Sequence, residues 1–235
     1  LAEQGYKQLL EREEWKLEQG GKYYVIRNGS AMVAFRVPKG TFGGFQIVAS
    51  HSDAPCLKLK ENPELWSEQA YVRLNVEKYG GMICSTWFDR PLSVAGRLLV
   101  KSEEGVTVKL VQIDKDLLML PSLAIHMNRD INTGYDYHAQ KDMLPLYGMG
   151  TKGEKESFMD RIAREADVKE EDILGSDLYV YNRMPGSVWG SEDEFISSGK
   201  LDDLECVYSS MASFLSAEEH DRIPVHCVYD NEEVG

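Results

Sequence analysis

Long apolar runs are missing from this sequence. Its 235 residues contain no stretch of about 18 apolar residues, and the first twenty residues are too polar for a signal peptide. We therefore expect no transmembrane helix, no membrane partner and a cytoplasmic location.

Cysteine is scarce as well. The cysteines form no CxxC pair, and their number and spacing fit neither a disulfide scaffold nor a zinc ribbon. We expect all of them to be reduced and buried: Cys56, Cys84, Cys206 and Cys227.

Positive charge is in deficit, since 26 Lys and Arg stand against 39 Asp and Glu and give a formal net charge of −13. A surface of this sign repels phosphate groups, so nucleic acid is not an expected partner. The hydrophobic share of 43% is enough for a sizeable core and excludes disorder as the main state.

The two ends of the chain have no closing element. The sequence begins at Leu1 without a Met, and it stops at Gly235, soon after an apolar run. We expect both ends to be cut, so that the composition describes part of a longer protein.

The pattern of apolar residues predicts a mixed α/β fold. Helical spacing favours helices over 5–19 and 201–215, and a charged, solvated helix within 152–172. Strand patterns occur at 23–27, 31–37, 44–50, 57–60, 71–78, 94–101, 106–113, 178–181 and 223–229. Of these, 44–50 and 223–229 are typical of buried strands. Asn28-Gly29 predicts a hairpin turn, and a second turn is expected at 102–105.

His51 and Asp53 follow the apolar run 46–49, where a strand meets a loop. Open α/β folds build their sites at such strand ends. Residues i and i+2 of a strand face the same way, so we expect the Asp53 carboxylate beside the His51 imidazole, where it would orient a metal-bound histidine. A hydrogen-bonded loop pair without a metal is the alternative.

Two pairs of adjacent carboxylates are further candidates. Glu232 and Glu233 follow a predicted buried strand, where they repel each other unless a cation or hydrogen-bond donors compensate. In a metal site one glutamate binds the ion and its neighbour takes a proton from water. A solvated acidic loop is the alternative there. For Asp202 and Asp203, at the start of a predicted helix, the alternative is N-terminal capping.

The motifs HSDAP, LDDL and DNEEVG occur in this order, together with the phrases FDRPLSVAGRLLV, LAIHMNRDIN and SGKLDDLECVYSSMASFL. This ordered set resembles the aspartyl aminopeptidase family of co-catalytic zinc metallopeptidases, which includes vacuolar aminopeptidase I. The resemblance covers the chain from about Gln46 onward.

The resemblance implies a role for each matching residue. His51 would bind one zinc, Asp53 would support it, and Asp202 would bridge two zincs. Glu232 would be the general base and Glu233 a ligand of the second zinc. Many relatives carry Asn at the position of Asp203, which we interpret as a tolerated change beside the bridging residue.

The same resemblance implies that two further ligands, an Asp and a His, lie beyond Gly235. The present chain then offers each zinc two protein ligands, whereas catalytic zinc sites usually have three. We expect the chain alone to be inactive.

The spacing of the motifs predicts an inserted domain. His51 and Asp202 must meet although 151 positions separate them, and connections in compact domains are far shorter. We expect a hydrolase domain at 1–86 and 199–235, interrupted by a unit at 87–198. The resemblance implies an α/β/α hydrolase domain and a mainly β association domain that builds a homo-oligomer, a tetrahedral dodecamer in intact members. It also implies that His126 reaches a neighbouring subunit's site, the alternative being a core or surface histidine.

The predicted function is that of a two-zinc aminopeptidase acting on peptides with a free N-terminus, with Asp or Glu preferred there by resemblance. Another two-metal amidohydrolase is one alternative. A non-catalytic assembly subunit of the same fold is the other, and the retained motif residues argue against it.

Overall fold

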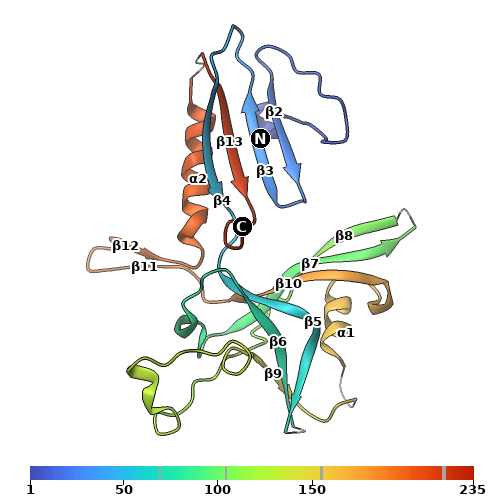
Figure 1. Ribbon diagram of the computed structural model, residues 1–235, viewed down its shortest axis with the longest axis vertical. Coiled ribbons are helices and arrows are strands. Elements are labelled where there is room, and N and C mark those ends of the chain that lie inside the picture. Colours follow the sequence, from blue (N-terminus) through green and yellow to red (C-terminus); the bar gives the residue numbers. More distant parts are fainter. Residues whose placement is uncertain (69, 104, 154–155, 219–220) are drawn as a thin grey trace. The chain divides into compact units, whose positions relative to one another are not determined.

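A computed structural model describes residues 1–68, 70–103, 105–153, 156–218 and 221–235 (Figure 1). The chain forms two compact units, Leu1–Ala54 with Ser198–Gly235, and Pro55–Ser197. We call them the first and the second unit. We expected boundaries at 86/87 and 198/199. The first boundary differs because the strands that follow Ala54 hydrogen bond within the sheet of the second unit.

The first unit is built on a five-stranded sheet with the order β1-β2-β3-β13-β4. Its strands are β1 (Lys7–Gln8), β2 (Lys22–Arg27), β3 (Ala31–Arg36), β4 (Phe45–His51) and β13 (Ile223–Tyr229). β13 runs parallel to β4 and antiparallel to β3. Helix α2 (Leu201–Ser216) packs along β4 and β13 (Figure 1). The chain therefore leaves β4 and β13 at the same end of the sheet.

The second unit holds a six-stranded antiparallel sheet with the order β8-β7-β10-β5-β6-β9. Its strands are β5 (Cys56–Ser67), β6 (Tyr71–Tyr79), β7 (Leu92–Ser102), β8 (Gly105–Gln112), β9 (Leu146–Met149) and β10 (Ile173–Asn182). Helix α1 (Phe158–Glu165) packs into the core of this sheet, and β11 (Ser187–Trp189) and β12 (Phe195–Ser197) form a separate hairpin. Short 3-10 helices lie at Ala2–Gln4 in the first unit and at Cys84–Trp87, Arg129–Asn132 and Glu170–Asp172 in the second.

Most predicted strands and the mixed α/β class are confirmed. The Asn28-Gly29 turn has positive φ at both residues, 53° and 74°, as a two-residue hairpin of this type requires. Helix 201–215 is confirmed as α2. The predicted turn at 102–105 includes residue 104, which lies outside the described residues.

The predicted helix over 5–19 is wrong. Gly5 has a φ of 80° and ends the 3-10 helix, and the next residues form β1, which pairs with β2. Tyr6 is buried against Phe214, with ring centroids 5.8 Å apart. Packing of this one aromatic ring and strand pairing therefore override the helical spacing of the segment.

Three predictions of burial need correction. β4 forms as predicted, but only Ser50 of its seven residues is buried, because the strand lies at the end of the described sheet. In the charged stretch 152–172, of which 154–155 lie outside the described residues, the described α-helix is the short α1, and a 3-10 helix follows at Glu170–Asp172. Helix α1 buries its apolar face through Phe158 and Ile162. The described cysteines are reduced, but only Cys227 is buried, and Cys206 is exposed.

Neither α-helix in the described part of the chain has the length and apolar character that a bilayer span requires. The predicted cytoplasmic location stays a prediction.

Candidate metal centre

The candidate centre lies in the first unit, around the last residue of β4. His51 pairs with Tyr229 in the parallel β4–β13 ladder, and the next residue, Ser52, donates its backbone N–H to the Tyr229 carbonyl at 2.8 Å. The ladder thus places the loop after β4 beside the loop after β13.

His51 is oriented by Asp53. Its Nδ1 lies 3.1 Å from the Asp53 carbonyl oxygen and 3.3 Å from the carboxylate Oδ1. An N–H at Nδ1 that donates to these oxygens leaves the lone pair at Nε2 free to bind a metal. The predicted position of Asp53 beside the imidazole is confirmed.

Three carboxylates surround Nε2 of His51. Asp202 Oδ1 lies 3.6 Å from it, Asp203 Oδ2 3.7 Å and Glu232 Oε2 3.8 Å. Two ligand atoms on one tetrahedral zinc are roughly 3.4 Å apart, given bond lengths near 2.1 Å. An imidazole nitrogen with carboxylate oxygens at this spacing fits zinc, which the residues would hold after small movements. Among the described residues, His51, Asp202 and Asp203 form a group able to hold a metal ion.

The start of α2 supplies the two aspartates. Asp202 and Asp203, joined by a cis peptide bond, have non-helical backbone angles, and the N-cap residue, Lys200, makes no side-chain cap hydrogen bond. Asp203 Oδ2 instead accepts the backbone N–H of His51 at 3.0 Å. The Asp203 side chain is 14% exposed and that of Asp202 is 94% exposed. The two neighbours therefore have different environments, with Asp203 built into the fold and Asp202 open to solvent.

Asp53 also holds the loop that carries the two glutamates. Its Oδ1 accepts the backbone N–H of Glu232 at 3.3 Å, and its Oδ2 accepts that of Glu233 at 3.1 Å. The Asp53 side chain is 6% exposed. The nearly buried carboxylate therefore contacts His51 and fixes the backbone of Glu232 and Glu233, while the carbonyl oxygen of the same residue is closer to Nδ1 of His51.

The carboxylates and hydrogen bonds of the centre shift the pKa values of several of its residues. Burial lowers the pKa of His51, but the hydrogen bond to Asp53 and the charges of Asp203 and Glu232 together outweigh it, so the pKa of His51 is raised. Interaction with the nearby Cys206 thiol and the hydrogen bond from the backbone N–H of His51 lower the pKa of Asp203, and the interaction with Asp203 raises the pKa of Cys206 to about 11. An electronegative site of this kind favours a cation.

The structure brings together five of the six predicted site residues: His51, Asp53, Asp202, Glu232 and Glu233, the last through its backbone. His126 belongs to the second unit, where it is exposed, and its role stays a prediction. Sequence reasoning undervalued Asp203, and its position next to Asp202 was the only available signal.

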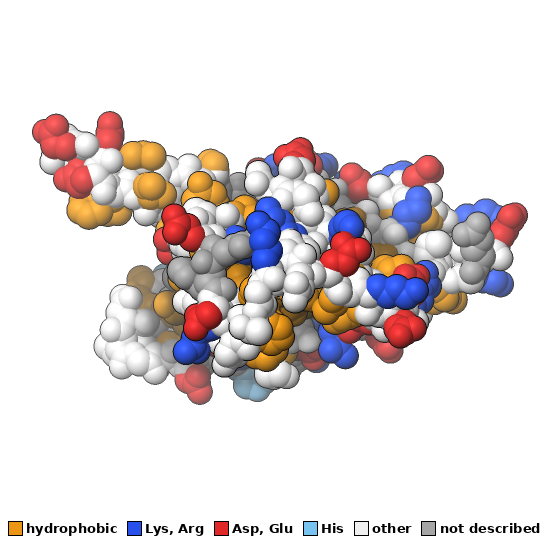
Figure 2. Space-filling view, turned by 90° about the horizontal axis from the view of Figure 1, so that it is seen from above, with side chains coloured by type: hydrophobic (Ala, Val, Ile, Leu, Met, Phe, Trp, Pro, Cys, Tyr) orange, Lys and Arg blue, Asp and Glu red, His pale blue; other side chains and the backbone are white. Residues whose placement is uncertain are grey.

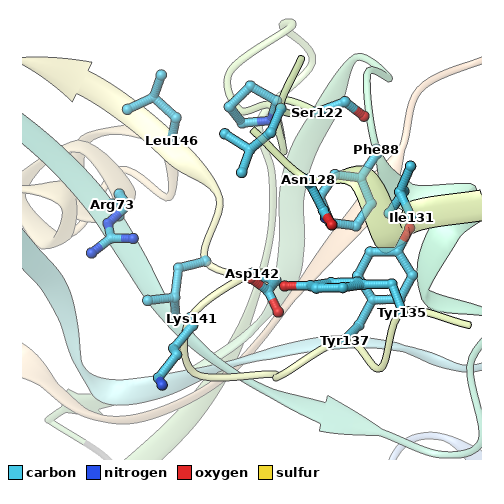
Figure 3. A pocket seen from close by; sticks show the side chains of 13 residues that line it. Arg73, Phe88, Ser122, Asn128, Ile131, Tyr135, Tyr137, Lys141, Asp142 and Leu146 are labelled. Atoms are coloured by element: carbon cyan, nitrogen blue, oxygen red, sulfur yellow. The ribbon is translucent and has the colours of Figure 1, made fainter. Parts of the chain in front are cut away.

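The second unit contains a cavity of about 250 Å³ between β6, β9 and the chain around 121–142. Figure 3 shows Phe88, Tyr135 and Tyr137 on one side of it and Arg73 and Lys141 on the other. None of the predicted site residues is among those that line it.

The chain is similar to known zinc metalloproteases, which is consistent with a metal site at this position. The family model described as "Aminopeptidase I zinc metalloprotease (M18)" matches residues 1–235. A Clostridium novyi protein named "Probable M18 family aminopeptidase 2" is 44% identical over 241 residues, which cover 100% of this chain and 56% of that protein. A Pseudomonas aeruginosa protein of the same name is 36% identical, over 98% of this chain and 55% of its own length.

Solved structures also resemble the whole chain. That of Chaetomium thermophilum mApe1 has a TM-score of 0.87 at 30% identity and covers 100% of this chain and 57% of its own. The mApe1 dodecamer of S. cerevisiae has a TM-score of 0.79 at 28% identity, over 100% of this chain and 55% of its own. The chain thus spans a little over half the length of the relatives that it matches.

Proposed function

Because the chain belongs to the M18 family of aminopeptidase I zinc metalloproteases, we propose that the protein carrying it removes the N-terminal residue from peptides at a two-zinc site. The observation that carries this proposal is the convergence of His51, Asp202 and Glu232 from three distant parts of the chain. Bound zinc supplies Lewis acidity, which polarises the scissile carbonyl group and acidifies water.

The proposed ligands are His51, Asp202 and Glu233. Nε2 of His51 would hold one ion, Glu233 would hold the other, and Asp202 would be a ligand shared by both. The exposure of Asp202 suits a bridging role, because its carboxylate is open on the solvent side. Since two protein ligands for each zinc fall short of the usual three, we expect the 235-residue chain alone to be inactive.

Glu232 is the proposed general base. Its carboxylate takes a proton from the attacking water and returns it to the leaving amine, which is the usual division of labour in a metallopeptidase. The 60% exposure of the Glu232 side chain leaves it accessible to water, while its backbone is fixed by Asp53. The preference for an acidic N-terminal residue rests on the family resemblance.

The adjacent glutamates provide the test, made in the intact protein. Glu232→Gln removes the proton acceptor, so turnover should fall by roughly 10²–10⁴-fold while the zinc content stays at the wild-type level. Glu233→Gln replaces an anionic ligand by a neutral amide, so zinc content should fall and added Zn²⁺ should partly restore turnover. Release of N-terminal Asp, Glu and Leu from matched peptides, with elemental analysis, gives both readouts. Normal turnover in both variants would refute the proposal.

We also propose that the second unit associates with further copies of this chain. Hairpin β11–β12 supports this, because all six of its strand residues are exposed, including Val188, Trp189, Phe195 and Ile196. Figure 2 shows hydrophobic and, at the tip, acidic side chains gathered on this hairpin. A two-stranded hairpin is marginally stable in water by itself, so a partner surface would stabilise it.

The association test substitutes the exposed apolar residues. Trp189→Ser with Phe195→Ser should shift the intact protein towards smaller species in light scattering, because the stacked pair, with centroids 4.8 Å apart, would no longer be available to a second copy. Glu192→Ser is the matched control at the hairpin tip. An unchanged mass for the double variant would place the interfaces elsewhere.

A further inference from the structure

Asp203 joins the start of α2 to the end of β4. Its Oδ2 accepts the backbone N–H of His51 at 3.0 Å, although the two residues are far apart in the sequence. The side chain is largely enclosed, at 14% exposure, while the side chain of Asp202 next to it is 94% exposed. The contact therefore belongs to the packed part of the unit.

The direction of the strand explains why this contact matters. The backbone N–H of Ser52 points to β13, where it donates to Tyr229. Neighbouring N–H groups of a strand point to opposite sides, so the N–H of His51 points away from β13 and towards α2. Asp203 thus accepts the hydrogen bond from the last N–H of β4 that points towards α2.

We propose that Asp203 is a positioning residue of the metal centre, which holds the backbone of His51 so that Nε2 faces Asp202 and Glu232. This inference rests on the proposed zinc site and assigns to Asp203 a role separate from that of a ligand. Only the oxygen acceptor is needed for it. Asparagine at this position would keep that oxygen, whereas alanine would remove it.

The experiment compares three variants of the intact protein. Asp203→Ala removes the acceptor, Asp203→Asn keeps it, and Glu205→Ala is the control, because Glu205 is an exposed acidic residue on the same helix. The first readout is zinc affinity, measured by competition with a fluorescent chelator. The second is hydrogen exchange of the His51 amide in the zinc-free protein, which reports the contact directly and needs neither metal nor activity.

Asp203→Ala should weaken zinc binding by roughly 10–100-fold, the usual effect of losing a group that orients a metal ligand. It should also accelerate exchange of the His51 amide. Asp203→Asn and Glu205→Ala should keep the wild-type affinity and the wild-type protection.

Two results would overturn the inference. An unchanged rate of hydrogen exchange at the His51 amide in Asp203→Ala would show that the contact with Asp203 does not hold the backbone of His51. Equal loss of zinc affinity in Asp203→Asn and Asp203→Ala would show that the charge of Asp203 matters rather than its position. If the wild-type protein binds no zinc, the proposed function fails, and the exchange of the His51 amide still decides whether Asp203 holds the strand.

Discussion

Gly96 is a glycine of the second unit at which an added methyl group should clearly lower the free energy of unfolding. It lies on β7 opposite Leu178 of β10. A Cβ atom at Gly96 would lie 2.0 Å from the carbonyl oxygen of Asp177 and 2.9 Å from the Cα of Leu178. Both are backbone atoms, so the methyl group can be accommodated only if β7 and β10 move apart.

The size of the effect follows from this separation. Overpacking of a well-packed site costs about 1–3 kcal/mol, and the loss of one ladder hydrogen bond adds about 1 kcal/mol. We therefore expect Gly96→Ala to lower the free energy of unfolding by about 2–4 kcal/mol, combining these two contributions. At roughly 2–4 °C for each kcal/mol in a unit of this size, Tm should fall by roughly 5–15 °C.

Gly175 provides a matched control on the same pair of strands. A Cβ atom there would lie 3.8 Å from Leu99 Cδ1, an ordinary contact, so Gly175→Ala should leave the stability unchanged or slightly increased. Thermal unfolding followed by circular dichroism, with chemical denaturation as a second measure, compares the two variants. Equal stability of Gly96→Ala and Gly175→Ala would refute the reasoning about the close approach of the two strands.

Three further predictions concern the centre and its support. Asp53→Ala should reduce zinc affinity by roughly 10–100-fold in chelator competition, because it removes the carboxylate that lies 3.3 Å from Nδ1 of His51 and accepts the backbone N–H groups of Glu232 and Glu233; wild-type affinity would contradict the geometry. Burial lowers the pKa of His226, so the folded protein binds a proton there only at a lower pH than the unfolded chain, which binds it near pH 6.5. Stability to urea should therefore fall as the pH drops below about 6.5, and His226→Gln should flatten that part of the profile; an equally steep profile in the variant would assign the effect to another group. If His126 reaches a neighbouring site, His126→Ala should lower turnover of the assembled protein at unchanged zinc content, whereas normal turnover would leave it a surface residue.

The strands and turns are the elements that the sequence predicts most reliably. The alternating pattern at 71–78 and the Asn28-Gly29 turn are local features, since side-chain alternation and positive φ depend on a few neighbouring residues. Predictions of secondary structure are wrong where packing against residues far away in the sequence determines the conformation. The segment 5–19 has helical spacing, yet Tyr6 is buried against Phe214 from the other end of the chain.

The candidate residues of the centre could be identified from the sequence because their types and order carry the chemistry. A histidine, two aspartates and two glutamates at predicted strand and helix ends are recognisable without coordinates, and the family resemblance rested on them.

What only the tertiary structure decided is which of these residues contact one another and through which hydrogen bonds. Residue type alone does not distinguish the adjacent Asp202 and Asp203, and the sequence gives Asp53 no connection to the glutamates some 180 positions away. The parallel pairing of β4 with β13, and the position of α2 beside them, aim the N–H of His51 at Asp203 and those of Glu232 and Glu233 at Asp53. Hydrogen bonds depend on direction and on distances of about 3 Å, and such distances between remote segments exist only after the sheet has formed.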